Sequence, residues 1–418
     1  MNRTIAIFTL CLNILTLIGC SSKKANDETS SSTDSTAVVS GNADTITVLP
    51  ADDSLPYVDL TKSYPLKKID LREVADVKYV QLEMTDKSLV GSMMDIAVRN
   101  DKILLKNVES GEILVFNIDG TYFTKISRKG GGPHEYRFLG LNCVDFENDL
   151  IYIMDQHYPP KIKVYDYDGY MQRELDISHI PSPDAMYLFD KYRLVVHYDP
   201  DETTDPENIV GSYPYRFINT QTGEITPVDI EIQNPVSPKI RKISGNQMLL
   251  SSIPMLPMLK SNNKVVISDY AYPTVYIQQG SQLKPLIRKS ECRRSGDDKQ
   301  ETLSVVKAIT DRYIVFQVVK RTIVDRNECA VSIDSQKEIL YDRKTKQVNE
   351  VDLINPDTGK SLYLQSGGDV PNNTLVVAYP TMVLETYNKK GYLSGELKEI
   401  AEQMDPEDNP VLAIITFK

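Results

Sequence analysis

The stretch from Asp119 to Gly169 decides the fold. It begins with Asp119-Gly120 and a short strand-like run, and it continues through the loop Arg128-Lys-Gly-Gly-Gly-Pro-His-Glu-Tyr136. Three more strand-like runs follow, and the stretch ends at Asp168-Gly169. The runs are rich in β-branched and aromatic residues, and small polar pairs separate them, which is typical of antiparallel strands joined by tight turns. The stretch therefore predicts one four-stranded unit and the loop that enters it.

The unit is repeated along the chain. Asn100-Asp101-Lys-Ile-Leu-Leu returns as Asn148-Asp149-Leu-Ile-Tyr-Ile, and Asp119-Gly120 returns as Asp168-Gly169, each about 50 residues later. A period of this length that contains only short strands indicates the blades of a β-propeller. Helical repeats would need amphipathic helices, and no stretch before Ser394 sustains a helical period.

Weaker copies continue toward the C-terminus. The third to sixth are marked by paired runs at 192–196 and 215–219, 264–268 and 274–278, 313–319 with 330–333 and 338–341, and 375–378 with 383–387. Six copies fit a propeller, which typically has four to eight blades. We predict an all-β fold: a six-bladed β-propeller of four-stranded antiparallel blades spanning residues 51–418.

The end of the chain departs from the repeat. Ser394 is suited to cap a short helix whose apolar face would carry Leu397, Ile400, Ala401 and Met404. After it, Val411 to Phe417 reads as a last strand. We predict that this strand and the region 57–82 together complete the ring, because closure removes exposed sheet edges.

Residues 1–19 have the pattern of a signal peptide. Asn2-Arg3 supplies the positive start, and the apolar run from Ile5 to Ile18 is too short to span a bilayer. Leu17-Ile-Gly-Cys20 resembles the lipobox of bacterial lipoproteins, which implies cleavage before Cys20 and its lipidation. Residues 20–50 are rich in small polar residues and are predicted to be a disordered tether. The expected location is the outer membrane of the cell envelope, with the leaflet left open.

Composition narrows the function classes. The net charge of −11 argues against nucleic acid as a partner, because phosphate recognition needs clusters of Lys and Arg. Cys143, Cys292 and Cys329 remain in the mature chain without the spacing of a zinc site. The sequence alone does not decide whether Cys292 and Cys329 form a disulfide. The sequence indicates no cofactor.

A known family shows similar features. Leu150-Ile-Tyr-Ile-Met-Asp155-Gln-His-Tyr-Pro-Pro-Lys-Ile-Lys-Val-Tyr-Asp166 resembles a blade of the NHL type, and Lys129-Gly-Gly-Gly-Pro-His-Glu-Tyr136 is similar to the segment that enters such blades. Together with the lipobox, the whole resembles the six-bladed NHL/TolB-like propeller lipoproteins of uncharacterised function from Gram-negative gut anaerobes. The resemblance implies fold and location, and it implies no catalytic residues.

A candidate ligand face follows from the blade geometry. In a four-stranded blade, the loop into the first strand and the loop between the second and third open on the same face. Tyr rings there would stack on a sugar or peptide, and His and carboxylates would bind it by hydrogen bonds. The candidates are His134, Glu135, Tyr136, Asp155, His157, Tyr158, His197, Tyr198, Asp269, Tyr270, Tyr272 and Tyr379. The alternative is that these residues only cap the blades, because propeller loops are commonly polar and aromatic.

Two function classes remain. The first is a non-catalytic binding propeller for a glycan, peptide or envelope protein, tethered to the membrane at Cys20. The second is a glycan- or peptide-acting hydrolase or lyase that uses Glu135 with Asp155, or a metal held by His134, His157 and His197. Gly130-Gly-Gly132 neither opens a helix nor precedes a Gly-Lys-Ser/Thr motif, so it is not a phosphate-binding loop. Since no catalytic motif is present, the sequence favours the first class.

Overall fold

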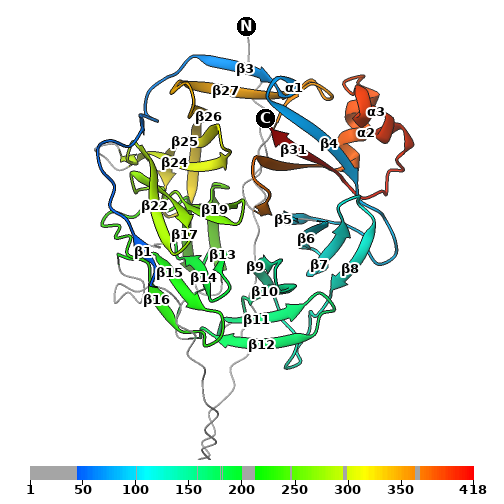
Figure 1. Ribbon diagram of the computed structural model, residues 1–418, viewed down its shortest axis with the longest axis horizontal. Coiled ribbons are helices and arrows are strands. Elements are labelled where there is room, and N and C mark those ends of the chain that lie inside the picture. Colours follow the sequence, from blue (N-terminus) through cyan, green and yellow to red (C-terminus); the bar gives the residue numbers. More distant parts are fainter. Residues whose placement is uncertain are drawn as a thin grey trace, which may run out of the picture.

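The protein is a ring of radially arranged β-sheets in the computed structural model, which describes residues 45–99, 101–157, 159–178, 180, 182–199, 212–244, 247–294, 299–362 and 368–418 (Figure 1). The predicted signal peptide, the lipidation site Cys20 and most of the predicted tether lie outside the described residues, as does Tyr158. Among the described residues, no helix is long and apolar enough to cross a membrane.

Five sheets have four antiparallel strands in chain order. The first sheet contains β5 (Met93–Arg99), β6 (Lys102–Asn107), β7 (Glu112–Asn117) and β8 (Tyr122–Ile126), and the second contains β9 (Leu139–Asp145), β10 (Leu150–Asp155), β11 (Lys161–Asp166) and β12 (Met171–Asp176). The third contains β13 (Ala185–Asp190), β14 (Arg193–His197), β15 (Tyr215–Asn219) and β16 (Ile225–Pro227), and the fourth contains β19 (Met258–Ser261), β20 (Lys264–Ile267), β21 (Thr274–Gln279) and β22 (Gln282–Lys289). The fifth contains β24 (Gln300–Ile309), β25 (Tyr313–Asp325), β26 (Ala330–Asp342) and β27 (Val348–Asn355). The all-β propeller prediction is thus confirmed.

The sheet that closes the ring has three strands, in the order β30 (Thr374–Tyr379), β31 (Val411–Phe417) and β4 (Ala75–Gln81). β31 lies antiparallel between the other two, so the predicted closure by both ends of the chain is confirmed. The prediction of six four-stranded blades is confirmed only in part. The short strand β29 (Asp369–Val370) directly precedes β30, but it pairs in parallel with β19 and leaves the closing sheet with three strands.

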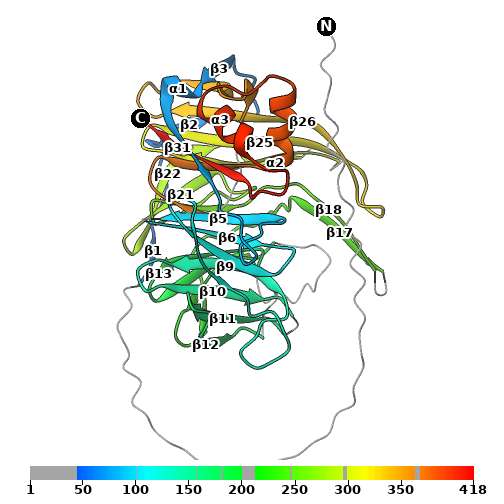
Figure 2. The same ribbon diagram turned by 90° about the vertical axis from the view of Figure 1, so that its right-hand side faces the viewer.

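Shorter strands extend the regular sheets. β1 (Thr47–Val48) and β2 (Tyr57–Val58) lie parallel to β22, and β3 (Leu66–Asp70) lies parallel to β27. β23 (Arg293–Arg294) and β28 (Lys360–Ser361) add to β24 and β27. β17 (Lys239–Ser244) and β18 (Gln247–Ser252) form a separate hairpin. Figure 2 shows this hairpin and the long β25–β26 hairpin extending beyond the ring on the same side.

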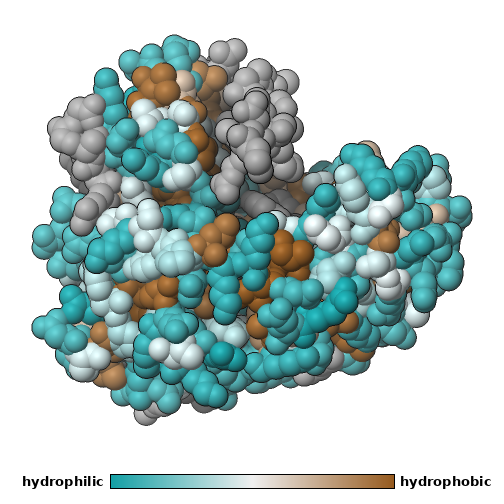
Figure 3. Space-filling view, turned by 90° about the horizontal axis from the view of Figure 1, so that it is seen from above, coloured by the Kyte–Doolittle hydropathy of each residue, from teal (hydrophilic) through white to brown (hydrophobic). Residues whose placement is uncertain are grey.

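The core lies between the sheets. Hydrophobic clusters fill the space between each neighbouring pair, and each contains residues of both sheets. Strands sandwiched in this way are buried on both faces, so they read as continuous apolar runs and not as alternation. In β10, for example, every residue from Ile151 to Asp155 is buried. Exposed apolar side chains are scattered, and the side seen in Figure 3 is mostly hydrophilic, with small apolar patches and a hollow between two raised parts.

The turns explain why the repeat begins and ends in small polar pairs. Gly120 and Gly169 have positive φ values of 92° and 78°, and Asp149 has a φ of 53°. A Cβ atom at Gly120 would lie 2.1 Å from the carbonyl oxygen of Gln81 in the closing sheet. Glycine at this turn therefore serves both the backbone conformation and the close approach of two sheets.

The helices differ in part from the sequence prediction. α3 (Gly395–Gln403) follows the predicted cap Ser394 and buries Leu397, which confirms the C-terminal helix. The run 383–387, predicted as a strand, lies instead in α2 (Thr381–Lys389). Leu384 is the buried residue of that helix and packs against the closing sheet, so tertiary packing overrides the β preference of the run. α1 (Leu71–Val74) is a single turn between β3 and β4.

Candidate functional site

A cavity of about 480 Å³ lies at the centre of the ring. Its walls come from sheets far apart in the sequence: β5 and β6, β9, β13, the β17–β18 hairpin, β19, β24 and β29. Apolar side chains such as Met93, Leu141, Met186 and Leu256 alternate with charged ones. A cavity of this size with a mixed lining is typical of a small-molecule site.

Gly368 lets the β29 segment enter the centre of the ring. Its φ is +89°, and a Cβ atom there would lie 1.8 Å from the carbonyl oxygen of Ile96 in β5. Only glycine fits a backbone that passes this close to another strand. The next residue, Asp369, is thereby placed in the cavity wall between β5 and β19.

Asp369 is held by two cations. Arg99 of β5 donates to its Oδ1 at 2.6 Å, and Lys260 Nζ of β19 lies 3.0 Å from its Oδ2. Asp369 and Lys260 are both buried, so the charges compensate one another where water is largely excluded. This group joins two sheets at the base of the cavity, since β29 and β19 belong to one sheet and β5 to the next.

Two further lysines line the same cavity. Lys106 of β6 donates to the carbonyl oxygen of Gly140 at 2.7 Å, and its Nζ lies 3.5 Å from Asp95 Oδ2. Lys307 of β24 lies 3.6 Å from Glu338 Oε1. Burial lowers the pKa of Lys307 despite the charge of Glu338. Burying the charged side chain of a lysine in such a strand costs free energy, so a lysine at this position suggests a functional role.

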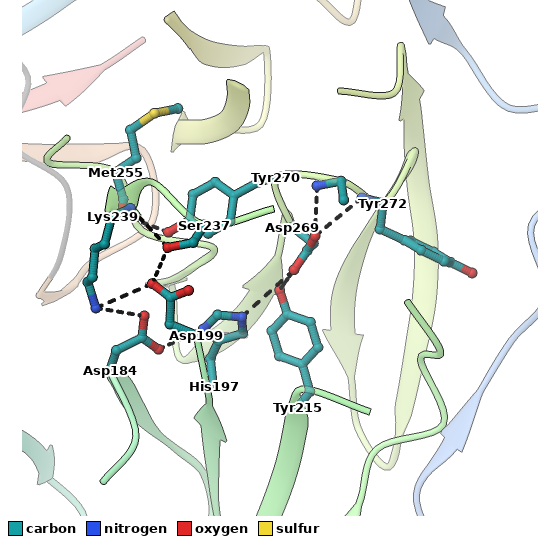
Figure 4. Close-up of polar contacts among 11 residues, drawn as sticks. Asp184, His197, Asp199, Tyr215, Ser237, Lys239, Met255, Asp269, Tyr270 and Tyr272 are labelled. Atoms are coloured by element: carbon teal, nitrogen blue, oxygen red, sulfur yellow. Dashed lines mark hydrogen bonds and ion pairs between the residues drawn. The ribbon is translucent and has the colours of Figure 1, made fainter. Parts of the chain in front are cut away.

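A buried polar network adjoins the cavity through Asp184 and Lys239 (Figure 4). Asp184 precedes β13 and accepts from His197 Nδ1 at 2.6 Å and from Lys239 Nζ at 3.2 Å. Lys239 also lies 3.5 Å from Asp199, which accepts from Ser237 Oγ at 2.8 Å. The network therefore fixes the start of the β17–β18 hairpin against β13 and β14.

The other side of His197 faces the next sheet. His197 Nε2 lies 3.8 Å from Asp269 Oδ2 and has no hydrogen-bond partner among the described residues. Asp269 accepts from the Tyr215 hydroxyl at 2.8 Å and from the backbone N–H of Ala271. Tyr215 and Tyr270 pack around the imidazole ring. His197 is fully buried, so it holds two sheets together and does not contact a ligand directly.

The charges of this network are coupled. Burial opposes protonation of His197, but the carboxylates of Asp184, Asp269 and Asp199 outweigh it and raise the pKa of His197. Burial acts against the charge of Asp184 too, yet His197 and Lys239 lower the pKa of its carboxyl group. Burial and the nearby charge of Asp184 raise the pKa of Asp199. The network is thus arranged around a protonated imidazole.

A pH dependence follows from the raised pKa of His197. The protonated ring stabilises the fold fully below its unfolded pKa of about 6.5, and this contribution is lost as pH rises through the folded-state pKa. We expect His197→Gln to lower the melting temperature more at about pH 6 than at about pH 9. The measurement is a thermal melt at both pH values with exposed His134→Gln as control. A deficit that is the same at both, or larger at the higher pH, would contradict the assignment.

The glycine-rich loop is organised by its own residues. Glu135 Oε2 accepts from the backbone N–H of Gly132 at 2.8 Å, and the carbonyl oxygen of Glu135 accepts from Lys163 at 2.6 Å. Asp155 is buried and accepts backbone N–H groups of Arg137, Phe138 and His157. The predicted carboxylate pair is thus engaged in holding the loop.

Most of the predicted tyrosines lie in the core. Tyr136, Tyr198, Tyr270 and Tyr379 are buried. Tyr136 donates to Gly111, Tyr270 donates to Met255, and Tyr379 accepts from Asn355. Tyr272 is partly exposed and stacks on Tyr276. These rings stabilise the contacts between blades, and the four buried ones offer no surface on which a ligand stacks.

The predicted histidines do not form one group. His134 is exposed, His157 lies 2.8 Å from an Arg137 guanidinium nitrogen, and His197 is buried beside Asp184. Among the described residues, no three His, Cys, Asp or Glu side chains are grouped so that they could hold a metal ion. Within the same residues, Cys292 and Cys329 are not joined by a disulfide.

The lysines of the cavity were missed by sequence reasoning. A signal was present for three of them, which lie inside apolar strand runs: Lys-Ile-Leu-Leu-Lys106-Asn, Met-Leu-Lys260-Ser and Val-Val-Lys307-Ala-Ile. A charge in the inner part of a propeller strand points to the central channel, since the other positions of these strands are buried between sheets.

The match with known families covers the whole ring. Residues 55–416 match the family described as "Domain of unknown function (DUF4934)". The chain belongs to the DUF4934 family. No curated protein matches this DUF4934 protein.

Solved structures show the same fold. A putative exported protein from Bacteroides fragilis is 17% identical, with a TM-score of 0.60 over 84% of this chain and 99% of that chain. A member of the DUF4221 family from Bacteroides vulgatus is 10% identical, with a TM-score of 0.44 over 82% of this chain and 97% of that chain. At 17% identity the likeness to the Bacteroides fragilis protein is one of fold alone.

Proposed function

We propose that this DUF4934 protein is an exported, lipid-anchored binding protein whose central cavity holds a small polar ligand. The observation that supports the proposal is the cavity of about 480 Å³, lined by Lys106, Lys239, Lys260, Lys307, Asp95, Asp184 and Asp369. Its volume falls within the range of roughly 300–1,000 Å³ of small-molecule sites. A monosaccharide or the side chain of a peptide would fit this space.

The hydrogen bonds and ion pairs of the candidate carboxylates favour binding over catalysis. Those of the loop, Glu135 and Asp155, accept backbone N–H groups. Those that line the cavity, Asp95, Asp184 and Asp369, lie 3.5, 3.2 and 3.0 Å from lysine ammonium groups. A general acid or base needs a group that is able to exchange its proton with the substrate. Groups held in this way position a ligand and do not exchange protons with it.

The proposal is tested by filling the cavity. Leu256 lines the cavity and is partly exposed, so Leu256→Trp is expected to occupy it and to remove the ligand. The full-length protein is purified from its native membrane, and the small molecules it retains are extracted and identified by mass spectrometry. Exposed Leu250, in the strand β18 that precedes the segment of Leu256 but outside the lining, gives the control Leu250→Trp. A compound retained by wild type and control but not by Leu256→Trp is the expected result; equal retention by all three contradicts the proposal.

Lipid anchoring is the second element of the proposal. The lipobox around Cys20 supports it, as does the likeness of the fold to a protein named as exported. Multiple acyl chains would anchor the protein stably, whereas one chain would be marginal. Cys20→Ala is expected to release the protein into the soluble fraction of the cell. If this variant stays with the membrane fraction, the anchor is elsewhere.

A further inference from the structure

We infer that the ligand of the central cavity is a small organic anion, whose carboxylate or phosphate group binds Lys260 and Lys106 at the base. This inference rests on the proposed function and names the class of ligand. The whole chain is acidic, with a net charge of −11, yet lysines are concentrated in the cavity lining. The composition alone would not predict a group of cations there. Anion binding is a physical reason for it.

The base of the cavity carries an excess of positive charge. Four cations, Arg99, Lys106, Lys260 and Lys307, are set against three anions, Asp95, Asp369 and Glu338. Asp369 is shared by two of the cations. Within these ion pairs of the described residues the cations outnumber the anions by one, which favours an anionic ligand, and a charge-assisted hydrogen bond is stronger at a buried site than at the surface.

The lysine hydrogen bonds are also incomplete. An ammonium group has three N–H donors. Among the described residues, Lys260 Nζ has one partner, Asp369. Lys106 Nζ donates to Gly140, but its carboxylate partner Asp95 lies at 3.5 Å, which is beyond a good hydrogen bond. Both ammonium groups keep donors for an acceptor in the cavity.

Two cavities meet at this point. Asp95, Lys260, Lys307 and Gly368 line the large cavity and also a second space of about 50 Å³ on the other side of them. These residues form a partition between the two. An anion that enters the large cavity would stop at this partition, with its charged group on the lysines and its polar body beside Asn142, whose buried Oδ1 has no hydrogen-bond partner within the described part of the chain.

The test uses calorimetric titration of the full-length protein with three anions, citrate, D-glucuronate and inorganic phosphate, and with neutral D-glucose. We expect at least one anion to bind, D-glucose to bind more weakly or not at all, and Lys260→Met to lower the anion affinity about tenfold or more. Lys106→Met is the second variant, since its partner Asp95 is partly exposed and tolerates the loss. Lys264→Met, an exposed position of β20, is the matched control.

The outcomes separate the two proposals. Binding of an anion that neither Lys260→Met nor Lys106→Met weakens places the anion elsewhere and overturns the inference. Failure of all three anions to bind overturns it as well. If a neutral compound is then retained by the wild type but not by Leu256→Trp, the cavity still binds a ligand and only the ligand class was wrong. If the wild type retains no compound, the proposed function itself fails.

Discussion

Replacing Arg321 by Met is expected to lower the free energy of unfolding by about 3–5 kcal/mol, the largest effect of any substitution considered for this protein. Arg321 of β25 donates to Glu301 Oε2 of β24 through Nε at 2.8 Å and Nη2 at 2.6 Å. Both side chains are almost fully buried. Removing the guanidinium takes two hydrogen bonds from the buried Glu301 carboxylate, whose Oε1 lies 3.9 Å from Arg326 Nη2. An inadequately paired buried charge accounts for the size of the effect.

The same substitution is also expected to affect the wall of the cavity. Arg321 also donates to the carbonyl oxygens of Ser237 and Pro238, which directly precede β17. Lys239, the next residue, lines the cavity and binds Asp184. Loss of Arg321 is therefore expected to loosen the hairpin wall and to weaken ligand retention as well as stability.

Denaturant unfolding followed by circular dichroism measures the stability of Arg321→Met. Lys320→Met, at the exposed neighbouring position, is the control and should change stability little. The double variant Arg321→Met with Glu301→Leu is expected to recover much of the loss, because it removes the buried charge along with its partner. If the double variant is no more stable than Arg321→Met alone, the unpaired charge is not the cause.

Asn409→Ala is expected to lower the free energy of unfolding by about 3 kcal/mol. Asn409 is buried just before β31, and its side chain makes three hydrogen bonds to backbone groups of the segment between β4 and β5. Its Nδ2 donates to Glu83 and Ser88, and its Oδ1 accepts from the N–H of Val90 at 2.8 Å. Alanine removes all three hydrogen bonds where β31 joins β4 to close the ring, and the Glu83 carbonyl then keeps only the bond from Ser88 Oγ.

Thermal and denaturant unfolding of Asn409→Ala, against the exposed neighbour Glu407→Ala, measures the effect. Asn409→Asp keeps the acceptor for Val90 and loses both donors, so its cost should also be large. A loss well under 1 kcal/mol in Asn409→Ala would show that the closing sheet does not depend on this side chain. Because closure joins β31 to β4, the ring should open at this sheet first.

Local sequence was sufficient for most of the strands. β10 and β11 follow from runs rich in β-branched and aromatic residues, and the turn after β11 follows from Gly169, whose positive φ glycine adopts readily. The helix after Ser394 followed from its apolar face. The strand prediction for residues 383–387 was wrong, because these residues form part of α2, where the burial of Leu384 decides the conformation. Local preference is weak against tertiary packing of this kind.

The candidate site was predictable only in outline. Blade geometry directed attention to the loops, and His197 and Asp269 do lie near each other across two sheets. Four tyrosines of those loops turn inward, since an aromatic ring at a strand end gains more by burial between sheets than by exposure; they are Tyr136, Tyr198, Tyr270 and Tyr379. Asp155 was assigned to a ligand and instead holds the loop backbone.

The sequence by itself determined the repeat, the strands and the residues that turn between them, because hairpin geometry depends on neighbours a few positions away. The tertiary structure alone decided that Lys106, Lys260 and Asp369 meet. They lie on β6, β19 and β29, and nothing in the local pattern records that β29 pairs with β19 and not with β30. The close passage of Gly368 past Ile96 fixes that crossing. Contacts between segments this far apart depend on how the ring closes, and closure is a property of the whole chain.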